Sequence, residues 1–185
     1  LESRARDVDI ASQLDYWATV ADAIVPVITD RPLDPSRDTV ATTADIHVSV
    51  PAQATETVLG PLTTALSAGV DDILVGALAV ATGVWRARRG LGVHSPIVGL
   101  EGHGRDETTV PGADLSRSVG WFTTWYPVSG DIGNVDPVAA LTDPNTAADA
   151  ILRIKESLAS APAHGIGYGV LRYLDSSAAQ RLTVS

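Results

Sequence analysis

The sequence predicts a mixed α/β architecture that forms one domain or one lobe of a larger domain. Segments with helical periodicity alternate with segments of strand character, without the strict strand–helix–strand rhythm of a parallel fold. Hydrophobic residues make up 45% and charged residues 19% of the 185-residue chain, which is enough to bury a core. The chain has four Trp, four Tyr and one Phe, so Ala, Val, Leu and Ile must form most of that core.

Helices are predicted where apolar residues recur every three or four positions. The strongest pattern covers residues 70–89, and Asp71 and Asp72 in its first turn suit the positive end of the helix dipole. Apolar residues extend around this helix, so we expect it to be buried on most sides. Its main stripe consists of Val70, Ile73, Leu74, Ala77, Leu78, Ala81 and Trp85. The other predicted helices cover residues 8–24, residues 54–66 and a part of 134–158 that includes everything from 147 onward.

Strands are predicted at residues 39–50, 93–100 and 118–126. The first of these is rich in Thr and Val, and its apolar residues alternate with polar ones from Ile46 to Val50, which is typical of a half-buried strand. A polar, glycine-bearing loop from 101 to 117 separates the other two strands.

Composition excludes several classes of function. A net charge of -9, with the 13 Lys and Arg residues scattered, argues against nucleic acid as a partner. The absence of Cys excludes disulfides, thiolate metal sites and Cys nucleophiles, and it fits a cytoplasmic protein. The longest apolar stretch, at 73–85, is too short to cross a bilayer, and no signal peptide is visible. The chain lacks Met even at position 1, so we expect it to be part of a longer polypeptide.

The first segment that could carry chemistry is Leu-Glu-Gly-His-Gly-Arg-Asp at residues 100–106. Glu101 ends an apolar strand, where partial burial would raise a carboxyl pKa and make the group a stronger base. Gly102 and Gly104 allow a backbone to approach a ligand closely. The alternative is a tight loop in which Glu101 and Arg105 form a structural ion pair.

Two further segments have unusual composition. Residues 117–128 hold half of the chain's Trp and its only Phe, which predicts either a core strand or the wall of a substrate channel. Residues 162–173 are rich in glycine, but they follow a turn containing Pro, and the third glycine of a dinucleotide-binding loop would fall at Val170. A nucleotide site is therefore not predicted. His94, Glu101 and His103 could in principle meet a metal ion, but a hydrogen-bonded histidine is the commoner case, so we expect no metal site.

These segments, in this order, resemble the signature motifs of the epimerization domains of nonribosomal peptide synthetases. Residues 101–106 resemble E-G-H-G-R-E, with Asp106 in place of the last Glu. Residues 118–128 resemble T-V-G-W-F-T-x-x-Y-P-V, residues 162–169 match P-x-x-G-x-G-Y-G, and residues 71–74 are similar to a weaker D-x-L-L motif. The related condensation domains have Asn and no Trp-Phe-Thr near Trp121, so the epimerization branch is favoured.

The resemblance covers nearly the whole chain and implies its place in a larger domain. Family members have two lobes of chloramphenicol acetyltransferase-like fold with the active site between them. Residues 1–185 would be the C-terminal lobe, since the H-H-x-x-x-D-G motif of the N-terminal lobe is absent and the closing F-N-Y-L-G motif does not occur before Ser185. The partners implied are the N-terminal lobe and a peptidyl carrier domain, with no nucleic acid and no membrane.

The resemblance also implies a reaction. The family inverts the α-carbon, L to D, of an aminoacyl or peptidyl thioester held on the phosphopantetheine of a carrier domain, and this lobe itself binds no cofactor. Glu101 would be one acid/base group and a histidine of the missing lobe the other, so the isolated chain is expected to be inactive. Residues expected to shape the loop are Gly102, His103, Gly104 and Arg105, and those expected to line or support the substrate channel are Trp121, Phe122, Tyr126, Gly167 and Tyr168.

Two other interpretations stay open. The chain would be a condensation-type acyltransferase lobe if its parent protein joins two substrates, or a non-catalytic module that docks carrier domains.

Overall fold

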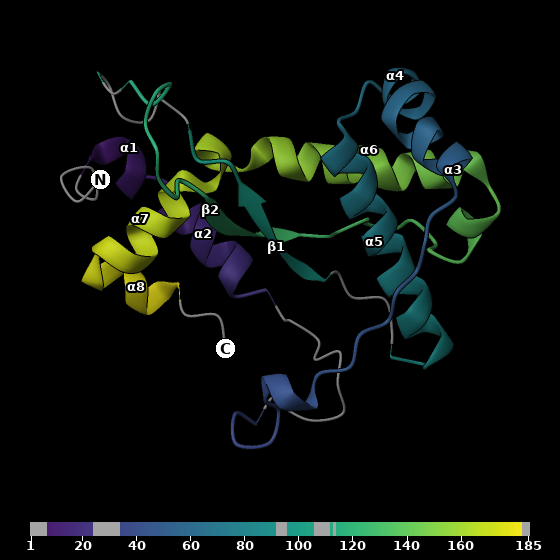
Figure 1. Ribbon diagram of the computed structural model, residues 1–185, viewed down its shortest axis with the longest axis horizontal. Coiled ribbons are helices and arrows are strands. Elements are labelled where there is room, and N and C mark those ends of the chain that lie inside the picture. Colours follow the sequence, from purple (N-terminus) through teal and green to yellow (C-terminus); the bar gives the residue numbers. More distant parts are fainter. Residues whose placement is uncertain (1–6, 24–33, 92–95, 106–111, 113, 183–185) are drawn as a thin grey trace.

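A computed structural model describes residues 7–23, 34–91, 96–105, 112 and 114–182. The predicted mixed α/β architecture is confirmed: a small antiparallel sheet lies between two groups of helices (Figure 1). One group is the pair α5 (Val70–Arg88) and α6 (Pro144–Ser160), and the other contains α1, α2, α7 and α8. The remaining bounds are α1 Val8–Ala11, α2 Leu14–Ala21, η2 Val40–Thr42, α3 Ala52–Thr57, η3 Val58–Leu62, α4 Thr63–Leu66, η4 Ala139–Leu141, η5 Pro162–Gly165, α7 Ile166–Leu174 and α8 Ser176–Arg181.

The sheet consists of β1 (Ile97–Gly102) and β2 (Thr124–Ser129), paired antiparallel. Leu100 lies opposite Tyr126, and Glu101 lies opposite Trp125. Because successive side chains of a strand point to opposite faces, Leu100 and Tyr126 share one face, whereas Glu101 and Trp125 share the other. A pair of strands alone is only marginally stable, so the helices packed beside it are needed to hold this register.

The helix pair α5 and α6 packs through small residues. Ala79 on α5 and Ala150 on α6 are almost completely buried, and they belong to one cluster with Ile154. A Cβ added at Gly76 would lie 3.0 Å from Cγ1 of Ile151, so the two helix backbones approach closely there. The N-terminus of α6 is capped by Asp143, whose carboxylate accepts hydrogen bonds from the backbone N–H groups of Asn145 and Thr146.

The second helix group is centred on Trp17 of α2, which is fully buried. Its ring meets Tyr168 of α7 and Tyr126 of β2 edge-on, with ring centroids 5.5 Å and 6.0 Å away. Edge-to-face packing of this kind adds specific geometry to burial. This aromatic cluster fixes β2 against α2 and α7.

Most predicted helices are confirmed, with differences at their ends. The helix predicted at 8–24 is two helices, because the chain turns at Ser12 and Gln13 between α1 and α2, and Ile24 lies outside the described residues. The helix predicted at 54–66 runs from Ala52 to Leu66, with a wider turn at η3 where Pro61 lies inside the helix. α7 was not predicted as a helix, since its glycines disfavour one, but Tyr168 and Leu171 are buried on it.

Three predictions were wrong. Residues 39–50 form no strand: Val40–Thr42 form η2, and 43–50 form an exposed, extended segment whose backbone pairs with no described strand (Figure 1). The strand predicted at 118–126 begins only at Thr124 and continues to Ser129. The strand predicted at 93–100 corresponds to β1, and residues 93–95 lie outside the described range. α5 is not buried on most sides: Leu74 and Leu78 are about half exposed, because the face of the helix that packs with α6 carries Val75, Ala79, Val80 and Val84 instead.

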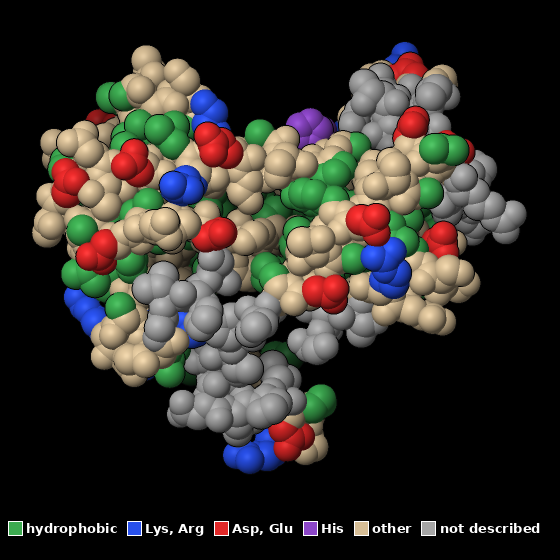
Figure 2. Space-filling model, turned by 180° about the vertical axis from the view of Figure 1, so that it is seen from behind, with side chains coloured by type: hydrophobic (Ala, Val, Ile, Leu, Met, Phe, Trp, Pro, Cys, Tyr) green, Lys and Arg blue, Asp and Glu red, His purple; other side chains and the backbone are tan. Residues whose placement is uncertain are grey.

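The described surface matches the composition. Lys and Arg lie singly among Asp and Glu on the face shown in Figure 2. Within the described part of the chain, no single helix is long and apolar enough to span a membrane. The stretches Ala52–Leu66 and Val70–Arg88 reach that length and composition only together, with a bend of 99° between them.

Candidate functional site

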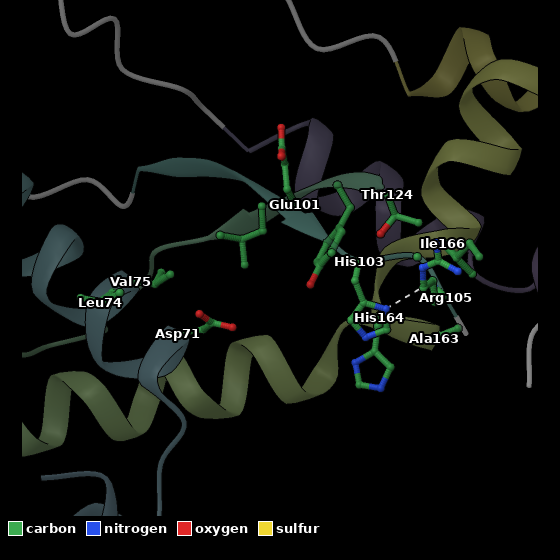
Figure 3. Close-up of a pocket in the computed structure, with 14 residues that line it drawn as sticks. Asp71, Leu74, Val75, Glu101, His103, Arg105, Thr124, Ala163, His164 and Ile166 are labelled. Carbon is green, nitrogen blue, oxygen red and sulfur yellow. Dashed lines mark hydrogen bonds between the residues drawn. The ribbon is translucent and has the colours of Figure 1, made fainter. Parts of the chain in front are cut away.

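A cavity of about 840 Å³ lies where the sheet meets α5 and the turn before α7 (Figure 3). It brings together four segments that are far apart in the sequence, and it includes the whole Glu-Gly-His-Gly-Arg segment. Its lining residues are Asp71, Leu74 and Val75 from α5, Leu100 to Arg105 from β1 and the residues after it, Thr124 and Tyr126 from β2, and Ala163, His164 and Ile166 from η5 and α7.

Glu101 lies at the rim of this cavity, with its carboxylate directed away from Asp71, His103 and His164 (Figure 3). This direction follows from the strand alternation, which sends Leu100 toward α5 and Glu101 to the opposite face. The side chain is exposed, and within the described residues it makes no hydrogen bond or ion pair. The structural ion pair with Arg105 is therefore not formed, and the carboxylate is open to an incoming group.

Arg105 does not pair with Glu101 but binds the segment that lies between the site and β2. Its guanidinium donates hydrogen bonds to the carbonyl oxygens of Leu115 (2.8 Å) and Ser118 (3.0 Å) and lies 4.5 Å from the ring centroid of Phe122. Its backbone N–H donates to Nδ1 of His103 at 3.0 Å, which orients that imidazole at the cavity wall. Arg105 thus ties the end of β1 to the segment that leads into β2.

The residues expected in a substrate channel lie in different environments. Tyr126 lines the cavity, and burial together with the negative charge of Asp71 raises the pKa of its phenol. Trp121 is 89% exposed, and Phe122 is half-buried beneath Arg105. Tyr168 belongs to the buried aromatic cluster, and Gly167 packs against the side chain of Gln13. Among the described residues of this set, Tyr126 is the member that borders the cavity.

The structure adds groups that sequence reasoning did not assign to the site. Asp71 was interpreted as a charge at a helix N-terminus, and His164 as part of a glycine-rich turn, yet both line the cavity. Both residues lie within segments that resemble family motifs, at 71–74 and 162–169, but no local pattern assigned either side chain to the site. The packing of α5 and η5 beside the sheet brings them there. Among the described residues, no group of three His, Asp or Glu side chains is arranged to hold a metal ion.

Comparison with known proteins gives consistent findings. The family model described as Condensation domain matches residues 2–183. The chain is 38% identical over 163 residues to one of the proteins of linear gramicidin synthase from Brevibacillus parabrevis, a match that covers 88% of this chain and 2% of that protein. It is 32% identical over 174 residues to bacitracin synthase 1 of Bacillus licheniformis, covering 94% of this chain and 3% of that one. The chain thus spans a very small part of these relatives.

A solved structure is also similar. The crystal structure of the epimerization domain from the third module of tyrocidine synthetase B superposes with a TM-score of 0.74 at 25% sequence identity. The match covers 98% of this chain and 38% of that chain. The fold is therefore that of part of a chloramphenicol acetyltransferase-like domain.

Proposed function

The chain belongs to the Condensation domain family, and on that premise we propose that it is the C-terminal lobe of an epimerization domain in a nonribosomal peptide synthetase. The proposed reaction inverts the α-carbon of an aminoacyl or peptidyl thioester carried by a neighbouring carrier domain. The observation that carries the proposal is the Glu-Gly-His-Gly-Arg segment, which ends β1 at the rim of the cavity in a fold similar to an epimerization domain.

The chemistry requires a base, a proton donor on the opposite side of the α-carbon and stabilisation of the enolate-like oxygen. Glu101 is suited to the first role because its carboxylate is exposed and has no hydrogen-bond partner among the described residues. A histidine of the N-terminal lobe would face it across the α-carbon. The phosphopantetheine arm belongs to the carrier domain and is part of the substrate. Closure of the second lobe would exclude water from the carboxylate, which strengthens the base.

The other site residues have supporting roles in this proposal. Gly102, Gly104 and Arg105 would fix the path of the chain after Glu101, and His103 would contribute to the cavity wall. Tyr126 would line the substrate channel, because it borders the described cavity. The residues that would support the site from outside the cavity lining are Trp121, Phe122, Gly167 and Tyr168. The isolated chain supplies one side of the site and is expected to be inactive without the other lobe.

The test uses the intact synthetase that contains this chain, with an L-aminoacyl group loaded on its carrier domain in deuterated water. Uptake of α-deuterium and formation of the D-aminoacyl group are followed together. Glu101→Gln is expected to lower both rates by about 100-fold or more, the usual contribution of a positioned base. Glu56→Gln on α3 removes another exposed carboxylate and serves as the matched control.

The outcomes separate the candidate functions. Exchange with inversion that disappears only in Glu101→Gln supports the proposal. Peptide-bond formation in the intact enzyme without exchange of the α-proton would instead support the condensation function of the same family. Exchange that is equally fast in Glu101→Gln and in the unmodified enzyme removes Glu101 from the role of base.

A further inference from the structure

The sheet face that carries Glu101 is mostly uncharged. β1 contributes Ile97 and Gly99 to this face beside Glu101, and β2 contributes Trp125, Pro127 and Ser129. Glu101 is the one ionisable side chain that the two strands place there. Pro127 is buried, whereas Gly99, Glu101 and Trp125 are exposed, so the open part of the face is the end that carries Glu101.

Trp125 is held in a defined position on this face. A Cβ added at Gly99 would lie 2.5 Å from Nε1 and 2.6 Å from Cζ2 of Trp125, so the indole rests directly on the glycine backbone. The ring of Tyr168, which is buried, supports the indole with centroids 5.8 Å apart. The side chain of Trp125 is nevertheless 45% exposed.

The indole of Trp125 is held in place by Gly99 and Tyr168 but remains half exposed, so it is suited to contact a ligand. Gly99 leaves room for the ring to lie across β1, and Trp125 is the direct cross-strand neighbour of Glu101. The Cβ atoms of such neighbours are about 5 Å apart. A substrate whose α-carbon meets the carboxylate of Glu101 therefore has its own side chain within reach of the indole.

We propose that Trp125, seated on Gly99, determines specificity by contacting an apolar side chain of the aminoacyl group presented to Glu101. This inference rests on the proposed epimerization function and adds the class of substrate. Aromatic and aliphatic side chains gain contact with the indole. A negatively charged side chain is disfavoured because the charge of Glu101 would repel it across an otherwise uncharged face.

The test measures α-deuterium exchange in the intact synthetase as a function of the concentration of loaded carrier domain. The carrier is loaded chemically with an L-phenylalanyl, L-leucyl, L-alanyl or L-aspartyl pantetheine. The variants are Trp125→Ala, Trp125→Phe, Gly99→Ala and the double variant Gly99→Ala/Trp125→Ala. Trp85→Phe on α5, where the indole stacks with Arg89 at 4.3 Å, is the matched control.

For L-phenylalanyl and L-leucyl groups, Trp125→Ala is expected to raise the half-saturating concentration at least about tenfold, with a much smaller effect for L-alanyl. Trp125→Phe should recover most of the loss. Gly99→Ala should act in the same direction, because its methyl group displaces the indole. The double variant should be no worse than Trp125→Ala, since no indole remains to be displaced.

The inference is overturned if Trp125→Ala leaves the half-saturating concentration unchanged for every aminoacyl group. It is also overturned if the effect of Gly99→Ala on this concentration persists fully in the double variant. Efficient exchange of L-aspartyl groups by the unmodified enzyme also contradicts it. Failure of the proposed function looks different, since the unmodified enzyme would then exchange no α-proton at all. Circular dichroism of each variant separates loss of fold from loss of contact.

Discussion

Gly165 is expected to control the position of β2 through its contact with Tyr126. The residue lies between η5 and α7 with φ +81, a left-handed conformation that is unfavourable for other residues. A Cβ at this position would lie 2.0 Å from Cδ1 and 2.1 Å from Cγ of Tyr126, well inside van der Waals contact. Gly165→Ala must therefore both strain the backbone and displace the ring.

The two effects have separate magnitudes. Placing alanine at positive φ costs about 1–2 kcal/mol, and forcing an extra methyl group into a packed site costs about 1–3 kcal/mol. We expect Gly165→Ala to lower the free energy of unfolding by about 2–5 kcal/mol in urea titrations followed by Trp fluorescence. Gly90→Ala is the control, since Gly90 has φ +68 with no atom within 4 Å of the added Cβ, and only the backbone cost of about 1–2 kcal/mol is expected.

A double-variant cycle tests the contact itself. In a Tyr126→Ala background the ring is gone, so Gly165→Ala should cost no more than Gly90→Ala. The reasoning is refuted if Gly165→Ala and Gly90→Ala are equally destabilising in the unmodified chain. It is also refuted if the cost of Gly165→Ala stays the same after Tyr126 is removed.

Two further predictions concern α6. Ile154→Ala, which empties a fully buried site between α5 and α6, should lower the free energy of unfolding by about 2–5 kcal/mol, whereas Leu152→Ala on the exposed side of the same helix should change it by about 0.5 kcal/mol or less; equal effects would contradict the described packing. Asp143→Ala should lower the melting temperature at neutral pH. Hydrogen bonds from Thr146 and Asn145 hold the pKa of this carboxyl below its ordinary value of 3.8, so its stabilising effect is present above pH 3.8 and is lost as the pH falls through the lower folded-state pKa. The difference between Asp143→Ala and the unmodified chain should therefore vanish in acid, and Asp143→Asn, which keeps the cap, should stay close to the unmodified chain at neutral pH.

The secondary structure could be predicted where local pattern and packing agree. α5 and α6 have periodic apolar residues and helix-favouring first turns, and both lie close to the predicted positions. The buried face of α5 could not be predicted in the same way. The sequence pattern gives most weight to large side chains such as Leu74 and Leu78, but the buried face consists of valines together with the small residues Gly76 and Ala79, which allow close approach to α6.

The segment from 43 to 50 shows a second limit of local pattern. Its alternation predicts a strand, and its backbone is extended, but Ile46 and Val48 are 91% and 83% exposed. A strand is defined by hydrogen bonds to a neighbour, and the pattern of one segment contains no information about whether that neighbour exists. α7 is the reverse case, since its glycines disfavour a helix locally, whereas burial of Tyr168 and Leu171 favours one.

The candidate site shows why a contiguous motif does not correspond to a contiguous site. Residues 100–105 lie next to one another in the chain, but the pleat of β1 sends Leu100 and Glu101 to opposite faces of the sheet. Leu100 meets the cavity beside α5, whereas Glu101 meets Trp125 on the other face. The neighbours of the Glu101 side chain are therefore those fixed by the antiparallel register. Trp125, on the other strand, shares a face of the sheet with Glu101, whereas Leu100, its neighbour in the sequence, does not. The motif identifies the carboxylate, and only the register identifies what surrounds it.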